Sequence, residues 1–389
     1  MRKWLWSVAA VGAGLVLAAV WTPPRAGHSV PPMPPLLVVA GDNGQRPEVR
    51  LTPPQPGLSA VPMQVGGRAA AGRDGGLRQE WPGFHVTARF DGSEVRVRFD
   101  DGINRWRVLL DGGQNGRIEL AMPETQDLLI SGLAPGAHEI RVEKISESFM
   151  PARFGGIFVD RSRATALPAP PAPHPLIEFI GDSDTVGLAN GATTRECSEA
   201  ESFAATDTSR AFGPQLAAEL GMDYRMIARS GIGLLRNYAG ATPETTMRDR
   251  YALALPGDPA AARLPQPPAD IVVTGLGSND FGSDLQPGEP WADVPALSRD
   301  FAPALTDFLR ARARENPGAL QVLLAFGEYG APLVAPYEAA QAALQAEGID
   351  ATLVVLPDLE RSACYWHPSA ADHMLIARSL VTAIRASGR

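Results

Sequence analysis

The first half of the chain alternates apolar and polar residues in short runs, as β-strands do. Residues 84–90 and 93–100 alternate clearly, and Asp101-Gly102 ends the second run before a third begins. Alternating runs joined by such a dipeptide are typical of a β-hairpin. Six or more runs of this kind, separated by turn residues and with no convincing helix, predict an antiparallel β-sandwich over residues 46–162.

From residue 176 onward, short apolar runs alternate with amphipathic helical patterns. The predicted strands are 176–180, 224–231, 270–280, 320–326 and 351–357, and the predicted helices are 209–221, 297–316, 335–348 and 369–387. Buried strands that alternate with helices form parallel sheets covered on both faces. Residues 176–389 are therefore predicted to form a three-layer α/β/α domain with a five-stranded parallel sheet.

Proline-rich segments separate these regions. Residues 163–175 contain five prolines, which block the continuation of both helix and sheet, so we predict a linker between the two domains there. Residues 27–45 are also proline-rich and show no period, which indicates a spacer.

The N-terminus has the pattern of an export signal. Arg2 and Lys3 precede an apolar run over residues 4–21, and prolines follow it. We interpret residues 1–26 as a secretory signal peptide, with an uncleaved membrane anchor as the alternative. No later segment is long and apolar enough to span a membrane. The expected location is periplasmic or extracellular.

Charge and cysteine content narrow the functional classes. The formal net charge of −8 argues against a nucleic-acid binder, which needs a basic surface. The chain has two cysteines, Cys197 and Cys364. Because thiols tend to pair in an oxidising compartment, a disulfide between them is the favoured interpretation, and two unpaired buried cysteines are the alternative.

Polar residues that follow the predicted strands provide a set suited to acyl transfer. Ser183 follows the first strand, Gly231 the second, Asn279 the third and His367 the fifth. Ligand sites of parallel sheets lie beyond the carboxyl ends of the strands, so these residues are expected to meet. Ser183 would be the nucleophile and His367 its base. The N–H groups of Ser183 and Gly231 and the Asn279 amide would hold the oxyanion.

Each of these residues also has a purely structural interpretation when it is taken alone, as a helix cap or a turn residue. Their occurrence together and in order favours the catalytic one. Asp184 is interpreted as a solvated surface charge, and His373 as a packing or surface histidine. The sequence has no Cys/His cluster, phosphate-binding loop or dinucleotide fingerprint, so we expect no metal and no cofactor.

The segment FIGDSDTVG resembles the nucleophile block of the SGNH (GDSL) hydrolases, and Gly231, Asn279 and His367 match the later blocks. A sandwich that runs directly into IEFIGDS, followed by the segments RSGIGLLRNY and CYWHPS, resembles carbohydrate esterase family 2. The segments FDDGINRWRVLLDGG, KISE and GGIFVD resemble the first domain of that family. That resemblance implies a jelly-roll first domain and an exported serine esterase. It implies removal of O-acetyl groups from hemicellulose-type polysaccharides or oligosaccharides, with a preference for 6-O-acetyl.

The sequence departs from the SGNH pattern at the acid of the triad. Cys364 and Tyr365 occupy the positions where relatives carry an aspartate. His367 is then oriented by a backbone carbonyl, a water or a more distant acid such as Asp358. The family that the chain resembles includes members that work with a Ser–His dyad, so we still expect esterase activity.

Three aromatic residues near the motifs are candidates for stacking on a sugar, and a core position is the alternative for each: Trp366, Trp291 and Tyr238. Two other functions stay open at this point. One is an SGNH esterase that acts on a different ester, such as a lipid or an acetyl group of peptidoglycan. The other is a carbohydrate-binding module without activity, which the missing acid favours slightly.

Overall fold

The structure is a computed structural model that describes residues 36–44, 46–171 and 175–388. The predicted signal peptide over 1–26 and part of the predicted spacer over 27–45 lie outside these residues. Within them, no helix is both long enough and apolar enough to cross a membrane.

The first region is an antiparallel β-sandwich, as the alternating pattern predicted. One of its sheets, within the described residues, has the strand order β1 (Leu36–Val39), β10 (Arg117–Ala121), β9 (Arg105–Leu110), β12 (Ala137–Lys144), β7 (His85–Gly92) and β14 (Ala164–Ala166), with β4 (Met63–Gly66) also paired to β7. The other has the order β2 (Glu48–Thr52), β11 (Asp127–Ser131), β8 (Val95–Asp100), β13 (Ala152–Val159), β6 (Leu77–Gln79) and β5 (Ala69–Ala71), with β3 (Ser59–Ala60) paired to β13.

Inward-facing residues of both sheets form one apolar core, which contains the aromatic cluster of Phe84, Phe99, Trp106 and Phe154.

Two strands lie outside the predicted bounds of 46–162. β1 falls in the predicted spacer and β14 in the predicted linker. Both are short edge strands of the same sheet. An edge strand pairs on one side only, so prolines next to it break no second set of hydrogen bonds.

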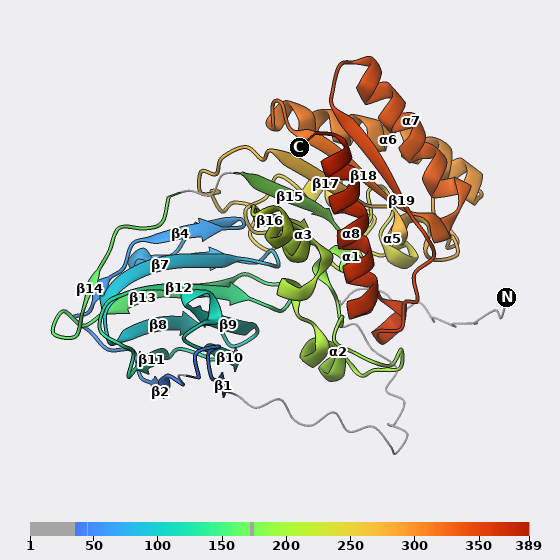
Figure 1. Cartoon of the computed structure of the whole chain (residues 1–389). Helices are drawn as coiled ribbons and strands as arrows, with labels where there is room; N and C mark the ends of the chain where they lie inside the picture. Colours follow the sequence, from blue (N-terminus) through green and yellow to red (C-terminus); the bar gives the residue numbers. More distant parts are fainter. Residues whose placement is uncertain (1–35, 45, 172–174, 389) are drawn as a thin grey trace. The chain divides into compact units, whose positions relative to one another are not determined.

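The second region is a three-layer α/β/α domain (Figure 1). In residues 175–388, parallel strands pair in the order β16 (Asp223–Ala228), β15 (Leu176–Gly181), β17 (Ile271–Gly275), β18 (Leu320–Phe326) and β19 (Ala351–Leu356). α3 (Phe212–Leu220) packs with α8 (Ala370–Ala386), and α6 (Val294–Glu315) packs with α7 (Ala331–Ala346). Four of these strands are buried almost throughout, which explains their continuous apolar runs, whereas β19 at the end of the order is only partly buried.

Several short helices complete this region: α1 (Ser183–Val186), α2 (Glu199–Ala205), α4 (Met247–Arg250) and α5 (Ser278–Phe281). α2 was not among the predicted helices, although its sequence signal is present. The Ser198 side chain accepts the Glu201 N–H, and the Glu201 side chain accepts the Ser198 N–H. This reciprocal pair is the Ser-x-x-Glu capping box. The predicted helix 209–221 begins later, at Phe212, after a separate 3₁₀ turn over Thr208–Arg210.

A buried charge cluster connects the middle of the parallel sheet to its surroundings. The Glu178 carboxylate on β15 accepts hydrogen bonds from Arg225 Nε on β16 and from the Tyr251 hydroxyl, and lies 3.8 Å from Arg68 Nη2. Burial acts to raise the pKa of this carboxyl, but Arg225 and Arg68 outweigh burial and hold the pKa below its usual range. The Glu178 charge therefore compensates two buried cations.

We predict that Glu178→Gln destabilises the fold strongly, because it leaves both arginines buried without a counter-charge. Breaking a buried ion pair in this way costs ~3–5 kcal/mol. The measurement is the midpoint of denaturant-induced unfolding, with Glu338→Gln on the exposed side of α7 as the control. Equal midpoints for the two variants would contradict the role given to Glu178.

Candidate active site

Loops that follow the parallel strands carry the predicted site residues. β15, β16 and β17 end in register, because Gly181 pairs with Ala228 on one side and with Gly275 on the other. Ser183 lies in α1 directly after β15, and α5 follows β17 at the same end of the sheet (Figure 1).

Side-chain hydrogen bonds join the three loops to one another. The Ser278 hydroxyl donates to the Asp182 carboxylate, which connects the loop after β17 to the loop after β15. Asn279 Nδ2 donates to the Ile232 carbonyl at 2.8 Å, which connects it to the loop after β16. The structure thus brings together the first three segments that the sequence singled out.

Asp280 fixes the loop after β16, a role that sequence reasoning missed. Its carboxylate is fully buried and accepts the backbone N–H groups of Leu234, Leu235 and Arg236 at 2.8–2.9 Å. Burial raises the pKa of the Asp280 carboxyl to about 6, although these three bonds oppose the rise. Asp280 therefore binds a loop that lies far from it in the sequence.

Asp182 organises the turn that carries Ser183. Its side chain accepts the Asp184 N–H at 3.0 Å, and its carbonyl accepts the N–H groups of Thr185 and Val186. The Ser183 N–H has no partner among the described residues. Ser183 itself is almost fully buried, with 7% of its surface exposed.

Gly231 lies in a tight turn closed by a hydrogen bond from the Ile232 N–H to the Arg229 carbonyl. Its φ of +79° is one that side-chain-bearing residues rarely adopt, and it fits the third position of a type II turn. Within the described chain, the Gly231 N–H also lacks a partner. The side-chain nitrogen Nδ2 of Asn279 carries two hydrogens, so one remains available for a ligand after the bond to the Ile232 carbonyl.

His367 is oriented by the main chain. Its Nδ1 lies 2.9 Å from the Cys364 carbonyl oxygen. Because that oxygen can only accept, Nδ1 must carry the proton and Nε2 is left as the basic nitrogen. Asp358 is exposed and makes no hydrogen bond to His367 in the described structure.

Asp184 is not the solvated surface charge that the sequence suggested. It is 2% exposed and forms a bidentate ion pair with Arg361, at 2.8 and 3.1 Å. Burial acts to raise its pKa, but Arg361 holds the pKa below its usual range. Arg361 also bonds the Trp366 carbonyl at 3.3 Å, so it links the residue after Ser183 to the residue before His367.

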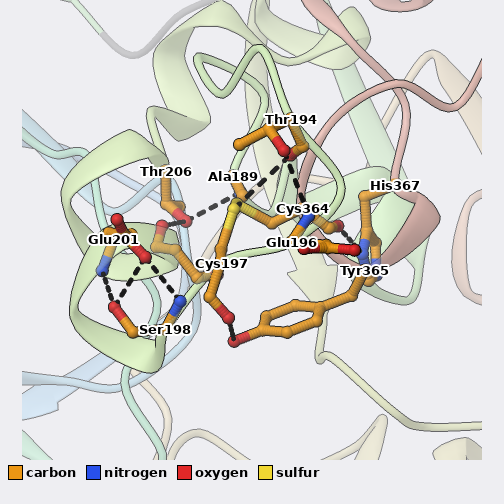
Figure 2. Close-up of a disulfide and its surroundings, with 11 residues drawn as sticks. Ala189, Thr194, Glu196, Cys197, Ser198, Glu201, Thr206, Cys364, Tyr365 and His367 are labelled. Atoms are coloured by element: carbon orange, nitrogen blue, oxygen red, sulfur yellow. Dashed lines mark hydrogen bonds between the residues drawn. A yellow bond between two sulfur atoms is a disulfide. The ribbon is translucent and has the colours of Figure 1, made fainter. Parts of the chain in front are cut away.

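Cys197 and Cys364 form the predicted disulfide (Figure 2), which confirms the favoured pairing. It joins the loop after α1 to the loop of His367. A second set of bonds runs beside it. The Tyr365 N–H donates to the Arg195 carbonyl, the Tyr365 hydroxyl donates to the Cys197 carbonyl, and the Arg195 side chain donates to the carbonyl of Arg361.

The three candidate substrate aromatics are not core residues in the described structure. Trp366 is 60% exposed and lies under the Arg195 guanidinium, which is 3.7 Å from the ring centre. Tyr238 is 54% exposed. Trp291 is half-buried, donates to Asp300 at 3.0 Å, and lines a cleft of about 430 Å³.

His373 lies in the core of the helix packing. It is fully buried, its ring stacks on Phe212, and its Nδ1 accepts the Phe212 N–H at 3.2 Å. Burial lowers its pKa to about 4, so it is neutral at pH 7. This arrangement agrees with the packing interpretation.

Comparisons with known proteins agree with the two-region architecture. Residues 65–170 match the family described as Carbohydrate esterase 2 N-terminal. An acetylxylan esterase/glucomannan deacetylase of Cellvibrio japonicus is 31% identical over 328 residues, which cover 83% of this chain and 90% of that protein. The chain belongs to carbohydrate esterase family 2.

Solved structures of family 2 are similar along most of their length. One carbohydrate esterase structure has a TM-score of 0.77 at 30% identity and covers 84% of this chain and 98% of its own. The family two esterase from Clostridium thermocellum in complex with cellohexaose has a TM-score of 0.71 at 27% identity, over 83% and 98% of the two chains. The chain is therefore a carbohydrate esterase that shares the fold of these structures.

We predict that activity falls at acid pH with a midpoint below the ordinary histidine value of ~6.5. Burial lowers the pKa of His367, although the Asp184 carboxylate and the Cys364 carbonyl act to raise it. A base must be neutral, so activity is lost only as pH falls through this lowered pKa. The measurement is kcat/KM against pH, and an acid midpoint clearly above ~6.5 would contradict this environment for His367.

Proposed function

We propose that this carbohydrate esterase removes O-acetyl groups from hemicellulose-type polysaccharides, with a preference for 6-O-acetyl, through an acetyl-enzyme on Ser183. The named activity of the Cellvibrio japonicus relative, an acetylxylan esterase/glucomannan deacetylase, supports this substrate class. The observation that carries the mechanism is a set of three donors without partners in the described structure: the N–H groups of Ser183 and Gly231 and one hydrogen of Asn279 Nδ2.

In the first step, Ser183 Oγ attacks the acetyl carbonyl carbon while His367 Nε2 takes the hydroxyl proton. The carbonyl oxygen becomes an oxyanion, which the three donors stabilise; one such donor is typically worth ~10²–10³ in turnover. The C–O bond to the sugar then breaks, and His367 returns the proton to the sugar oxygen. Water repeats the sequence on the acetyl-enzyme and releases acetate.

His367 works in this proposal as part of a dyad. A triad carboxylate holds the imidazole in one tautomer and stabilises the imidazolium ion. Here the Cys364 carbonyl takes over the first task. The Asp184 carboxylate contributes to the second through space, because it favours the protonated form of His367 without a hydrogen bond to it.

Trp366, Tyr238 and Trp291 are proposed to contact the polysaccharide. The exposed ring of Tyr238 and the ring face of Trp366 opposite Arg195 offer flat apolar surfaces for a sugar face. Trp291 and the cleft that it lines provide a second place for a sugar unit.

We also propose that the protein is exported by the signal over residues 1–26, and is either released or tethered by an uncleaved signal. The disulfide supports an oxidising location, where such bonds persist.

We predict that Ser183→Ala and His367→Ala each lower acetate release by at least ~10⁴-fold, because neither the nucleophile nor its base can be replaced. The measurement is acetate release from acetylated glucomannan and acetylated xylan, with Ser379→Ala in α8 as the control serine variant. Circular dichroism checks the fold. Near-normal turnover in either active-site variant would refute the mechanism, and hydrolysis of lipid esters but not of these polysaccharides would refute the substrate class.

We predict that Asp358→Asn leaves turnover nearly unchanged, because a backbone carbonyl already orients His367. Loss of an orienting carboxylate costs ~10⁴ in a full triad. Tyr365→Asp removes the bond of the Tyr365 hydroxyl to the Cys197 carbonyl, but the disulfide still joins these two loops. The variant is expected to be tolerated or mildly activating, since the family resemblance places a carboxylate at this position. A ~10³–10⁴-fold loss in Asp358→Asn with the fold intact would show that the acid has moved along the chain.

A further inference from the structure

The sandwich region contacts the turn that carries Gly231 through two carboxylates. Glu147, which follows β12, accepts the Ser230 N–H at 2.7 Å with one oxygen and the Ser230 hydroxyl with the other. Glu80, which follows β6, forms an ion pair with Arg229 at 3.2 Å. The two residues that precede Gly231 are thus each bound by an acidic residue of the sandwich.

The segments that carry these two carboxylates are tied to one another. Lys144 is 1% exposed, and its ammonium group donates to the Glu80 carbonyl at 2.6 Å and to the Ser148 hydroxyl at 3.2 Å. It therefore ties Glu80 to the segment that contains Glu147. The second carboxylate oxygen of Glu80 accepts the Gly257 N–H at 2.7 Å, which anchors it to the α/β region.

The Gly231 turn has little packing of its own on the side where a side chain would project. A Cβ built at Gly231 would meet no atom within 4 Å. The closing bond to Arg229 and the bond from the Tyr238 N–H to the Gly231 carbonyl shape the turn but do not attach it to the sandwich. The bidentate contact of Glu147 with Ser230 supplies that attachment, one residue before the proposed oxyanion donor.

We infer that Glu147 is a positioning residue for catalysis, through which the sandwich domain fixes the Gly231 N–H in the oxyanion hole. This inference rests on the proposed function of Gly231. It assigns the sandwich a role in turnover in addition to any role in binding. A misplacement of a catalytic group by about 1 Å can cost ~10² in rate, which sets the scale of the effect.

The test compares Glu147→Ala with Glu147→Gln. The alanine variant removes both bonds to Ser230 and is expected to lower kcat ~10–10²-fold with KM little changed. Glutamine restores both bonds, because its oxygen accepts the Ser230 N–H and its NH₂ donates to the Ser230 hydroxyl. Glu147→Gln is therefore expected to keep most of the turnover. Ser230→Ala removes only the hydroxyl bond and is expected to give a smaller loss of kcat.

Glu119→Ala is the matched control. Glu119 is also a partly buried sandwich carboxylate, but it pairs with Arg107, which contacts Asp207 rather than the Gly231 turn. A normal kcat in Glu147→Ala, an equal loss in Glu147→Gln, or an equal loss in Glu119→Ala would overturn the inference. If Glu147→Ala does not fold, a normal kcat in Ser230→Ala would overturn it.

The variant Asn279→Ala distinguishes a failure of this inference from a failure of the proposed oxyanion hole on which it rests. A ~10²–10³-fold loss in that variant supports the oxyanion hole. If that loss occurs but Glu147→Ala has normal kcat, the inference alone fails. If Asn279→Ala keeps normal turnover, the proposed oxyanion hole itself fails.

Discussion

The geometry of this site depends on one hydrogen bond, from His367 Nδ1 to the Cys364 carbonyl. A carboxylate can turn about its side-chain bonds to meet an imidazole, whereas a carbonyl is fixed by the backbone. The loop itself must therefore hold its shape. The disulfide from Cys364 to Cys197, the contacts of Arg195 and the ion pair of Arg361 with Asp184 all restrain this loop from outside.

The charges near the proposed nucleophile also help to hold the loop of His367. Asp184 directly follows Ser183, and a buried carboxylate without a partner would be costly there. Arg361 compensates it and at the same time bonds the Trp366 carbonyl beside His367. One ion pair thus connects the loops of both proposed catalytic residues. The Asp184 charge still acts on His367 and favours its protonated form.

Most of the fold could be predicted from the sequence, because local pattern reflects burial. The five parallel strands appeared as apolar runs, and the residues that follow their ends identified one edge of the sheet. The disulfide was predicted from the export-signal pattern and the cysteine count. The burial of Asp184 could not be predicted, because Arg361 lies far along the chain. The contact of Glu147 with Ser230 was equally hidden, since it crosses from one region to the other. The α2 helix, in contrast to these long-range contacts, could have been predicted, because its capping box is a local sequence pattern.

The most direct test of the central claim is the tautomer of His367, measured by ¹⁵N NMR on enzyme with labelled histidine. The His367 signals can be assigned by their loss in His367→Gln. Above the pKa of His367, the account predicts a proton on Nδ1 and an unprotonated Nε2, because the Cys364 carbonyl can only accept. A resting enzyme with the proton on Nε2 would contradict the account, since that nitrogen would then be unable to take the proton of Ser183.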